Sequence, residues 1–489
     1  QFLRSEKYIS DYNEVVSLGT RNSQTRTADQ TEVGIFWGYD GAPKLGVPPR
    51  LYNQVVRVIA IKKNNTLQQN AQLFAFVNYA MADAGISAWE TKYYYELWRP
   101  ILGVRQGSPT TRAIPNWLPL GAPADGGGDN FTPPFPSYVS GHSTFGSAAF
   151  EMLRLFYGTD QFQFQFQSDE YNGATKDSIT GRVRPNRTRS YERFSQAEEE
   201  NFLSRIYLGV HWRIDQEEAR IQCISIDTNL LRTQAKNLID AYESKPTDAI
   251  LFWNAVLLNA AANDYDNSIA DSPDQAGPTT TSRAFAIIHG AMYEAMNGFE
   301  RIYISMYRPS SMPATYDVPR APAVEAAITE AAYQTLYALY PKQRELFTQT
   351  RNNFIKLVRG DSSDNAGINK GILVGKLLAL TILESRSSDN SQNQGTYKLI
   401  NQTGYHQPDP THPDQPFLSP RWGTVTPFVI QSGSQFRASN TVGNTLAGRR
   451  QFLRSEKYIS DYNEVVSLGT RNSQTRTADQ TEVGIFWGY

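Results

Sequence analysis

Apolar residues recur every three and four positions along most of this chain, the spacing that places them on one face of an α-helix. The pattern predicts helices over 48–62, 69–97, 143–157, 197–206, 211–240, 251–264, 282–297, 323–340, 342–358 and 366–385. Gly298 and Pro341 stand where two of these helices should stop. The simplest architecture is an all-α fold of two helical bundles joined by long irregular loops.

Two segments depart from the helical pattern. Residues 161–167 alternate strictly between Gln and Phe, which predicts a strand. Asn172-Gly173 follows, so we expect a short β-hairpin on a loop. Residues 395–434 are rich in Pro, Gly and Asn and are predicted to form a long irregular surface segment.

Residues 1–39 and 451–489 are identical letter for letter. Divergent repeats of a solenoid do not match so perfectly, so three explanations are open. They are an engineered rearrangement, a circular permutant with overlapping ends, and an oddly assembled sequence. The polar stretch at 242–247 is the kind of place where native termini would meet. We expect one copy to pack natively and the other to be displaced, disordered or lent to a neighbouring subunit.

This duplication sets the expected domain organisation. One helical bundle is placed at 40–244 and a second at 246–390, with a loop-rich segment at 391–450. The first 39 residues and their copy stand outside this division.

Composition excludes several classes of protein. The net charge is -1, which argues against a nucleic-acid partner because binding phosphates normally needs a basic surface. Cys223 is the sole cysteine, so no intrachain disulfide or Cys-based zinc site forms, and we expect a small buried side chain. The longest apolar stretch, near 250–262, is too short to cross a bilayer. The opening residues lack the apolar core of a signal peptide.

We therefore expect a soluble protein without a membrane span, located in the cytoplasm or secreted. Its oligomeric state is not readable, although aromatic-rich helical surfaces often associate and a homo-oligomer is one outcome.

The candidate chemistry lies in three short segments, of which the first spans residues 92–100. Lys92 and Arg99 are seven positions apart, so on a continuous helix both cations would lie on one face, and Pro100 would end that helix. Taken alone, this segment is more typical of a solvated basic face than of a site.

The second segment contains Ser140-Gly141-His142 and leads into an apolar helix expected from Ser143. A Ser-Gly turn at a helix start presents free N–H groups and a hydroxyl, which together can hold an anion. An ordinary Ser N-cap beside an incidental histidine explains the same pattern.

The third segment contains Arg205, His211 and Asp215. His211 and Asp215 are four positions apart, so the carboxylate can reach the imidazole. Arg205 and His211 would not share a helix face, but a break at Gly209 would let both point to one place. Alone, a helical histidine with a carboxylate is usually structural. Combined, the three segments describe a pocket for a tetrahedral oxyanion.

The spacings within these segments resemble a known signature. Lys-x6-Arg-Pro, Pro-Ser-x2-Ser-Gly-His and Ser-Arg-x5-His-x3-Asp are all present, in order. This three-part signature is shared by vanadium-dependent haloperoxidases and type 2 phosphatidic acid phosphatases. The resemblance is close from about residue 30 to 220 and extends to the rest of the chain only in helical character.

The resemblance implies a role for each signature residue. The cations would hold the oxygens of a vanadate cofactor, aided by a hydroxyl and a backbone N–H: Lys92, Arg99, Arg205, Ser140 and Gly141. His211 would be the apical ligand of vanadium, with Asp215 supporting it, and His142 the acid–base group. The neighbouring cations should lower the pKa of both histidines by like-charge repulsion.

Flanking residues resemble the chloroperoxidase branch of that family. Trp89 and Phe135 stand where that branch borders its halide site, and Asp40 resembles an acidic residue that supports the site. A core aromatic is an equally good interpretation of Trp89. The implied activity is oxidation of bromide or chloride by hydrogen peroxide to hypohalous acid, which halogenates a small organic acceptor. Lys92 would hydrogen-bond the peroxide.

Two other functions fit the same residues. A soluble acid phosphatase would use His211 as the nucleophile, giving a phosphohistidine, with His142 protonating the leaving group. A catalytically silent helical scaffold or oxyanion-binding protein is the third hypothesis. The remaining histidines, His289, His406 and His412, are expected to be structural or exposed.

Overall fold

The computed structural model describes residues 2–125, 128–234, 248–307, 309, 312–313, 315, 320–360 and 365–440. Within these ranges the chain is mostly helical, which confirms the predicted all-α class. The helices of the first part are α1 (Glu6–Leu18), α2 (Ala28–Phe36), α3 (Pro48–Lys62), α4 (Leu67–Tyr95), α5 (Pro100–Gln106), α6 (Gly141–Tyr157), α7 (Phe194–Tyr207) and α8 (Arg213–Gln234). Those of the second part are α9 (Ala249–Asn263), α10 (Gly277–Glu300), α11 (Arg320–Leu339), α12 (Arg344–Arg359) and α13 (Asn365–Ser385). The periodic pattern did not predict α1, α2 or α5.

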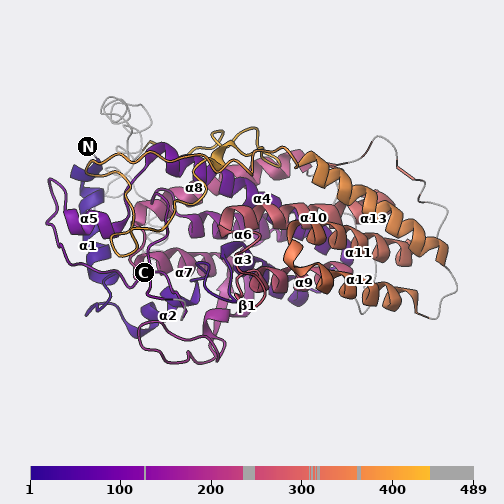
Figure 1. The fold of residues 1–489 in the computed structure, drawn as a ribbon, viewed down its shortest axis with the longest axis horizontal. Helices are drawn as coiled ribbons and strands as arrows, with labels where there is room; N and C mark the ends of the chain where they lie inside the picture. Colours follow the sequence, from indigo (N-terminus) through magenta and orange to yellow (C-terminus); the bar gives the residue numbers. More distant parts are fainter. Residues whose placement is uncertain are drawn as a thin grey trace, which may run out of the picture.

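The helices run roughly along the long axis of the molecule, with α1, α2 and α5 at one end and α11, α12 and α13 at the other (Figure 1). Helix α4 lies at the centre and is buried on nearly all sides. Thr66 caps its N-terminus in a capping box with Gln69, in which each side chain accepts from the other residue's backbone N–H.

One hydrophobic core runs through both groups of helices, and α4 packs against α6 in the first group and α10 in the second. The division into domains at 40–244, 246–390 and 391–450 therefore stays a prediction. Helix α13 is long and apolar enough, by length and composition alone, to cross a membrane. It exceeds the stretch near 250–262 that the sequence analysis singled out, and here it packs on α11. A Cβ on Gly371 or Gly375 would meet a backbone oxygen of α11 at 2.2 Å, so these glycines permit the close packing.

The predicted strand at 161–167 exists as β1 (Gln161–Gln167) and forms an antiparallel pair, but Asn172-Gly173 is not the turn that joins the two strands. Strand β1 pairs antiparallel with β2 (Thr188–Arg193), with Phe164 opposite Tyr191. Asn172-Gly173 lies within the long connection rather than in a two-residue turn. That connection includes a 3-10 turn, Asp169–Tyr171, and carries Glu170 into the interior, where it pairs with Arg184 at 2.8 Å.

The segment 395–434 is irregular as predicted, apart from a 3-10 turn at Trp422–Thr424, but it is not confined to the surface. Trp422, Phe428 and Ile430 are buried. The carboxylate of Asp83, on α4, accepts backbone N–H groups of Phe428, Val429 and Ile430 at 2.7–2.9 Å. These bonds replace the backbone pairing that an irregular segment lacks, so it can enter the core.

The first copy of the duplicated sequence, residues 2–39, packs into the fold. Tyr8 lies 5.1 Å from Trp212, ring to ring, and Trp37 is fully buried. The second copy, 451–489, and the polar junction at 242–247 lie outside the described residues. The prediction that one copy is displaced stays a prediction.

Candidate active site

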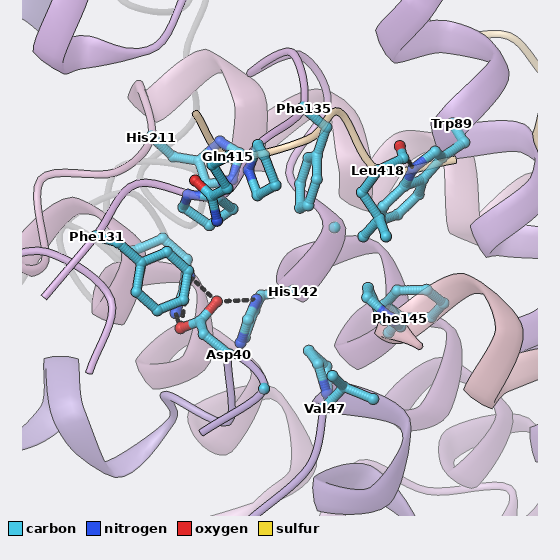
Figure 2. A pocket seen from close by; sticks show the side chains of 18 of the residues that line it. Asp40, Val47, Trp89, Phe131, Phe135, His142, Phe145, His211, Gln415 and Leu418 are labelled. Atoms are coloured by element: carbon cyan, nitrogen blue, oxygen red, sulfur yellow. Dashed lines mark hydrogen bonds and ion pairs between the residues drawn. The ribbon is translucent and has the colours of Figure 1, made fainter. Parts of the chain in front are cut away.

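A cavity of about 280 Å³ opens where several helices of the first part begin or end. Figure 2 shows His142, His211 and Asp40 facing it from one side, with Trp89, Phe145 and Leu418 on the opposite side. Most of the lining comes from α4, α6 and α7, from the segments 40–48 and 131–135, and from His211. Tyr265, the start of α10, and Gln415 and Leu418 of the irregular segment supply the rest.

The first predicted segment is bent rather than helical throughout. Helix α4 ends at Tyr95 because Glu96 adopts a left-handed conformation with φ 52°. Arg99 is the N-cap of α5, and Pro100 is its first residue. The prediction that Lys92 and Arg99 share one helix face, and that Pro100 ends the helix, was therefore wrong. The bend still brings both cations within 5.0 Å of the Phe135 ring centroid.

Lys92 is fully buried and does not line the cavity itself. Its ammonium donates to the carbonyl oxygens of Pro136 at 3.0 Å, Ser137 at 3.1 Å and Val139. Burial, then the nearby Arg99 charge, lowers the pKa of Lys92 well below its usual value. All three donors are occupied, so Lys92 influences the cavity through its charge in this conformation.

Arg99 connects the first segment to His211. Its Nη1 donates to Val210 O and to His211 Nε2, each at 2.9 Å, and its Nε donates to Phe135 O at 2.8 Å. Nη2 is buried and has no hydrogen-bond partner among the described residues. Burial lowers the pKa of Arg99 to about 9.

The second segment forms the start of α6, two residues earlier than the predicted Ser143. Ser140 is the N-cap, and its Oγ accepts from Ser143 N at 3.4 Å. The N–H groups of Gly141 and His142 belong to the first turn, where a helix offers no internal acceptor. Because Gly141 and His142 line the cavity, this helix start presents donors to an anion there.

His142 is held between a carbonyl and a carboxylate. Its Nε2–H donates to Gly38 O at 2.5 Å, and its Nδ1 lies 3.9 Å from an oxygen of Asp40. Burial, and next the charge of Arg205, lowers the pKa of His142 to about 3. The direction is as predicted, but burial outweighs like-charge repulsion. His142 is therefore a neutral imidazole at neutral pH, able to take a proton.

Arg205, near the end of α7, pairs with Asp40 in a two-pronged contact. Nη2 lies 2.9 Å from one carboxylate oxygen, and both terminal nitrogens lie 3.1 Å from the other. Its Nε is buried and, in the part of the chain that is described, has no partner. Gly209, with φ 71°, takes the backbone out of the helical conformation after α7, as predicted.

His211 lies in the turn before α8 rather than on the helix that the pattern predicted. Its Nδ1–H donates to Asp215 at 2.8 Å, and the same carboxylate oxygen accepts from Ser137 Oγ and Trp212 N. This bond puts the lone pair on Nε2, which accepts from Arg99 here and can act as a ligand or nucleophile once that bond opens. Burial and the cations Arg99 and Lys92 lower the pKa of His211 well below its usual value. Burial raises the pKa of Asp215 to about 7.

The apolar side of the cavity centres on Trp89 and Phe135, whose ring centroids are 4.9 Å apart. Both line the cavity and both are largely buried, so Trp89 is at once a core aromatic and part of the site. Gln415 and Leu418 also line the cavity, and the sequence analysis did not identify them. They carry no motif, and only the path of the irregular segment brings them here.

Of the three histidines outside the signature, two are buried and one is partly exposed. His289 is buried, stacked on Phe74 at 5.1 Å between ring centroids. His406 is buried beside Tyr397 and Phe417. His412 is partly exposed and lies 3.3 Å from Asp409.

Comparison with known proteins bears directly on this part of the chain. Residues 72–240 match the VCPO second helical-bundle domain. The vanadium chloroperoxidase of Curvularia inaequalis is 42% identical over 232 residues, which cover 41% of this chain and 38% of that protein. Over these residues the chain is therefore similar to vanadium chloroperoxidases.

A solved structure, the crystal structure of the first bacterial vanadium dependant iodoperoxidase, is 26% identical. The aligned region covers 48% of this chain and 50% of the iodoperoxidase chain, and the TM-score is 0.36. The chain thus spans half or less of the length of both relatives.

The residues around this cavity fit an anion of the size of vanadate. Arg99 Nη2 and Arg205 Nε are buried donors without described partners, and the start of α6 adds backbone N–H groups. A buried, unpaired donor on a cation is costly, so an oxyanion here would satisfy it. His211 and His142 each add an unprotonated ring nitrogen, Nε2 and Nδ1 respectively.

Proposed function

We propose that this protein is a vanadate-dependent haloperoxidase, which oxidises bromide or chloride with hydrogen peroxide to hypohalous acid. The observation that carries the proposal is the convergence of Arg205, His142 and His211 on one cavity, with Arg99 hydrogen-bonded to His211 and one donor of each arginine unpaired among the described residues. The kinship of residues 72–240 to a vanadium chloroperoxidase supports it.

In this proposal Arg99 and Arg205 hold the oxygens of vanadate, aided by Ser140 and the N–H groups of Gly141 and His142. His211 Nε2 is the protein's ligand to the metal. Arg99 Nη1 now donates to that nitrogen, so it must turn away, while its bond to Val210 O can persist. Bound vanadate supplies a Lewis-acidic centre that makes hydrogen peroxide open to attack by halide.

His142 accepts a proton from peroxide in this scheme. Its low pKa keeps the imidazole neutral before the reaction, and a bound anion offsets the charge of Arg205 and makes a proton on His142 more stable. Asp40 holds Arg205 in place and lies near Nδ1, where it stabilises the protonated ring.

Lys92 contributes a positive charge behind the anion. Since its three donors are occupied by carbonyl oxygens, direct hydrogen bonding to peroxide requires one of these bonds to open. In a site with little water, the charge alone stabilises an anion and draws electron density from it.

Trp89 and Phe135 border the place proposed for halide. Their rings form a surface with little competing water, and a halide that has shed part of its hydration is a stronger nucleophile. The cationic groups Lys92 and Arg99, each within about 5 Å of the Phe135 ring, offset the charge of the incoming halide.

The decisive experiment measures bromination of monochlorodimedone by the purified chain with peroxide and bromide, with and without vanadate. The haloperoxidase requires vanadate for turnover. A phosphatase acting through His211 instead hydrolyses p-nitrophenyl phosphate and is inhibited by vanadate, and a silent scaffold does neither. Absence of vanadate-dependent bromination at saturating vanadate would refute the proposal.

A further inference from the structure

Residues 38–40 hold two side chains of the proposed mechanism in place. Gly38 O accepts from His142 Nε2–H at 2.5 Å. Asp40 pairs with Arg205 and lies 3.9 Å from His142 Nδ1, and in Figure 2 it faces the His142 ring. Both contacts therefore depend on the path of one short stretch of backbone.

This stretch contains a backbone conformation that is unfavourable by itself. Tyr39, which lies between Gly38 and Asp40, has φ 48°, in the left-handed region that residues with a side chain rarely adopt. Helix α2 ends at Phe36, three residues earlier, so the helix does not hold Tyr39 in this conformation. Contacts from elsewhere in the chain must fix it.

The 3-10 turn between β1 and β2 supplies such contacts. Glu170 Oε1 accepts from Tyr39 N at 2.9 Å, and Asp169 N donates to Tyr39 Oη at 2.8 Å. Ser168 Oγ, just before the turn, donates to Phe36 O at 2.6 Å. Three consecutive residues thus hold the backbone that leads to Asp40, and Glu170 alone bonds to the backbone of Tyr39.

Glu170 is itself fixed by a buried arginine. Its Oε2 accepts from Arg184 Nη1 at 2.8 Å, and the same nitrogen lies 2.6 Å from Asp125 Oδ1. All three side chains are buried, and burial raises the pKa of both carboxyl groups, so the pair can retain one proton beside a single arginine. A Cβ on Gly38 would lie 2.6 Å from Glu170 Oε1, so the carboxyl group packs directly against the backbone that contacts His142.

We propose that Glu170 is a positioning residue for the acid–base group of the site. It fixes the Gly38 carbonyl, and with it the ring of His142. Through Tyr39 it also fixes Asp40 against Arg205. Glu170 does not line the cavity, so it acts only through these neighbours. The inference rests on the proposed function for the reaction that it serves, whereas the positioning is a property of the chain without vanadate.

Two substitutions of Glu170 differ chiefly in whether an acceptor remains. Glu170→Gln keeps a carbonyl oxygen for Tyr39 N–H, whereas Glu170→Met has a similar length and no strong acceptor. Both leave Arg184 paired with Asp125, so neither leaves a buried cation without a carboxylate. A difference between the two variants therefore reports on the bond to Tyr39.

Glu294→Met is the matched control. Glu294 is buried in α10 and accepts the backbone N–H groups of Met306 and Tyr307, so its replacement removes similar bonds. Glu294 does not line the cavity. Loss of stability should therefore appear in both Met variants, whereas only Glu170→Met should alter His142.

The first measurement follows exchange of the His142 Nε2–H proton with water, by NMR of the vanadate-free chain with ¹⁵N-labelled histidine. The signal is assigned by its absence in His142→Ala. In Glu170→Met this exchange should be about fivefold faster, the factor that one neutral hydrogen bond contributes, because Gly38 O moves away. Glu170→Gln and Glu294→Met should leave the exchange rate unchanged.

The second measurement is vanadate-dependent bromide oxidation, expressed per bound vanadate so that unfolded chains do not count. Misplacement of His142 in Glu170→Met should lower kcat by about 10–100-fold and leave the KM for bromide unchanged. Glu170→Gln should restore most of the rate. Glu294→Met should keep the rate and lower only the melting temperature.

A folded Glu170→Met variant with the exchange rate of the unmodified chain would overturn the proposal. If that variant does not fold, Glu170→Asp replaces it, because its ion pair with Arg184 holds a carboxylate that is one methylene short of Tyr39 N–H. Unchanged exchange in Glu170→Asp would also overturn the proposal. Failure of the unmodified chain to brominate with vanadate would instead refute the haloperoxidase, and the exchange measurement would still decide the role of Glu170.

Discussion

The helices around α4, α6 and α7 and those from α9 to α13 bury histidines in opposite ways. His289 lies inside an unbroken helix, α10, stacked on Phe74 and 3.3 Å from the amide of Asn254. His211 lies where one helix has ended and the next has not begun, and His142 lies in the first turn of α6.

The difference shows what makes a site within a helical bundle. A helix interior satisfies its own backbone, so a histidine there faces packed side chains. A helix end leaves N–H groups and carbonyls unpaired, and these can face an anion or fix a cation. Arg99, Ser140 and His211 all stand at such ends. The comparison predicts that changes at the interrupted helices affect function, whereas changes at His289 affect stability.

The largest effect is expected for His142→Ala. Loss of the proton acceptor should lower the rate of vanadate-dependent bromide oxidation by about 10²–10⁴-fold, the usual contribution of a positioned acid–base group. Vanadate binding, measured by ⁵¹V NMR, should persist. The matched control is His289→Gln, which should keep the rate and lower only the melting temperature. A fully active His142→Ala enzyme would contradict the role.

How far this site could be predicted depends on which contacts are local. Arg205, His142 and His211 line one cavity, as the signature implied, whereas Lys92 and Arg99 lie behind it. Their exact placement was wrong at Glu96, whose left-handed conformation ends α4 early and which no local signal marks. Gln415 and Leu418 were missed because the bonds of Asp83 to the irregular segment are long-range and invisible in the pattern.

The helical fold was predicted more completely than the loops for the same reason. Amphipathic periodicity identified the long helices, including α3 and α6. It missed α5, a helix of seven residues that depends on the bend before Arg99. The strand β1 was predictable from its alternation, whereas its partner β2 is distant in sequence and carries no comparable pattern.

The next largest effect is expected for His211→Ala. Removing the only proposed protein ligand to the metal should weaken vanadate binding by more than about 100-fold, since loss of a group that merely orients a ligand already costs about 10–100-fold. Equilibrium dialysis with vanadate measures this directly. Asp215→Asn should weaken vanadate binding by only about 10–100-fold, because it removes the carboxylate that accepts from His211 Nδ1–H and orients the ring. Unchanged affinity in His211→Ala would place the metal elsewhere.

A smaller effect concerns the pH dependence of stability that the two buried histidines cause. Both His142 and His289 have a pKa of about 3, but Arg205 contributes only to the shift of His142, and burial is the cause for His289. A histidine with a folded pKa below its unfolded value of about 6.5 binds fewer protons when folded. Stability is therefore complete above about pH 6.5 and is lost as the pH falls toward 3.

Phosphate, a tetrahedral anion without redox chemistry, tests the origin of these shifts. In NMR titrations of labelled imidazoles, phosphate should raise the pKa of His142, because it offsets the charge of Arg205, and should leave that of His289 unchanged. Equal responses of the two histidines would show that the anion does not bind beside His142. They would also contradict the claim that the charge of Arg205 lowers the pKa of His142 alone.

The smallest effect is expected from deletion of residues 451–489. Residues 2–39 already pack on α5, α7 and α8, and Gly38 O accepts from His142 Nε2, so the site has its complement of these residues without the copy. The melting temperature and vanadate affinity should change within error. Deleting both copies is the control and should abolish vanadate binding, because it removes the Gly38 carbonyl and the buried Tyr8 and Trp37. A fall of several degrees on removing 451–489 alone would mean that the copy, rather than residues 1–39, stabilises the helices around the site.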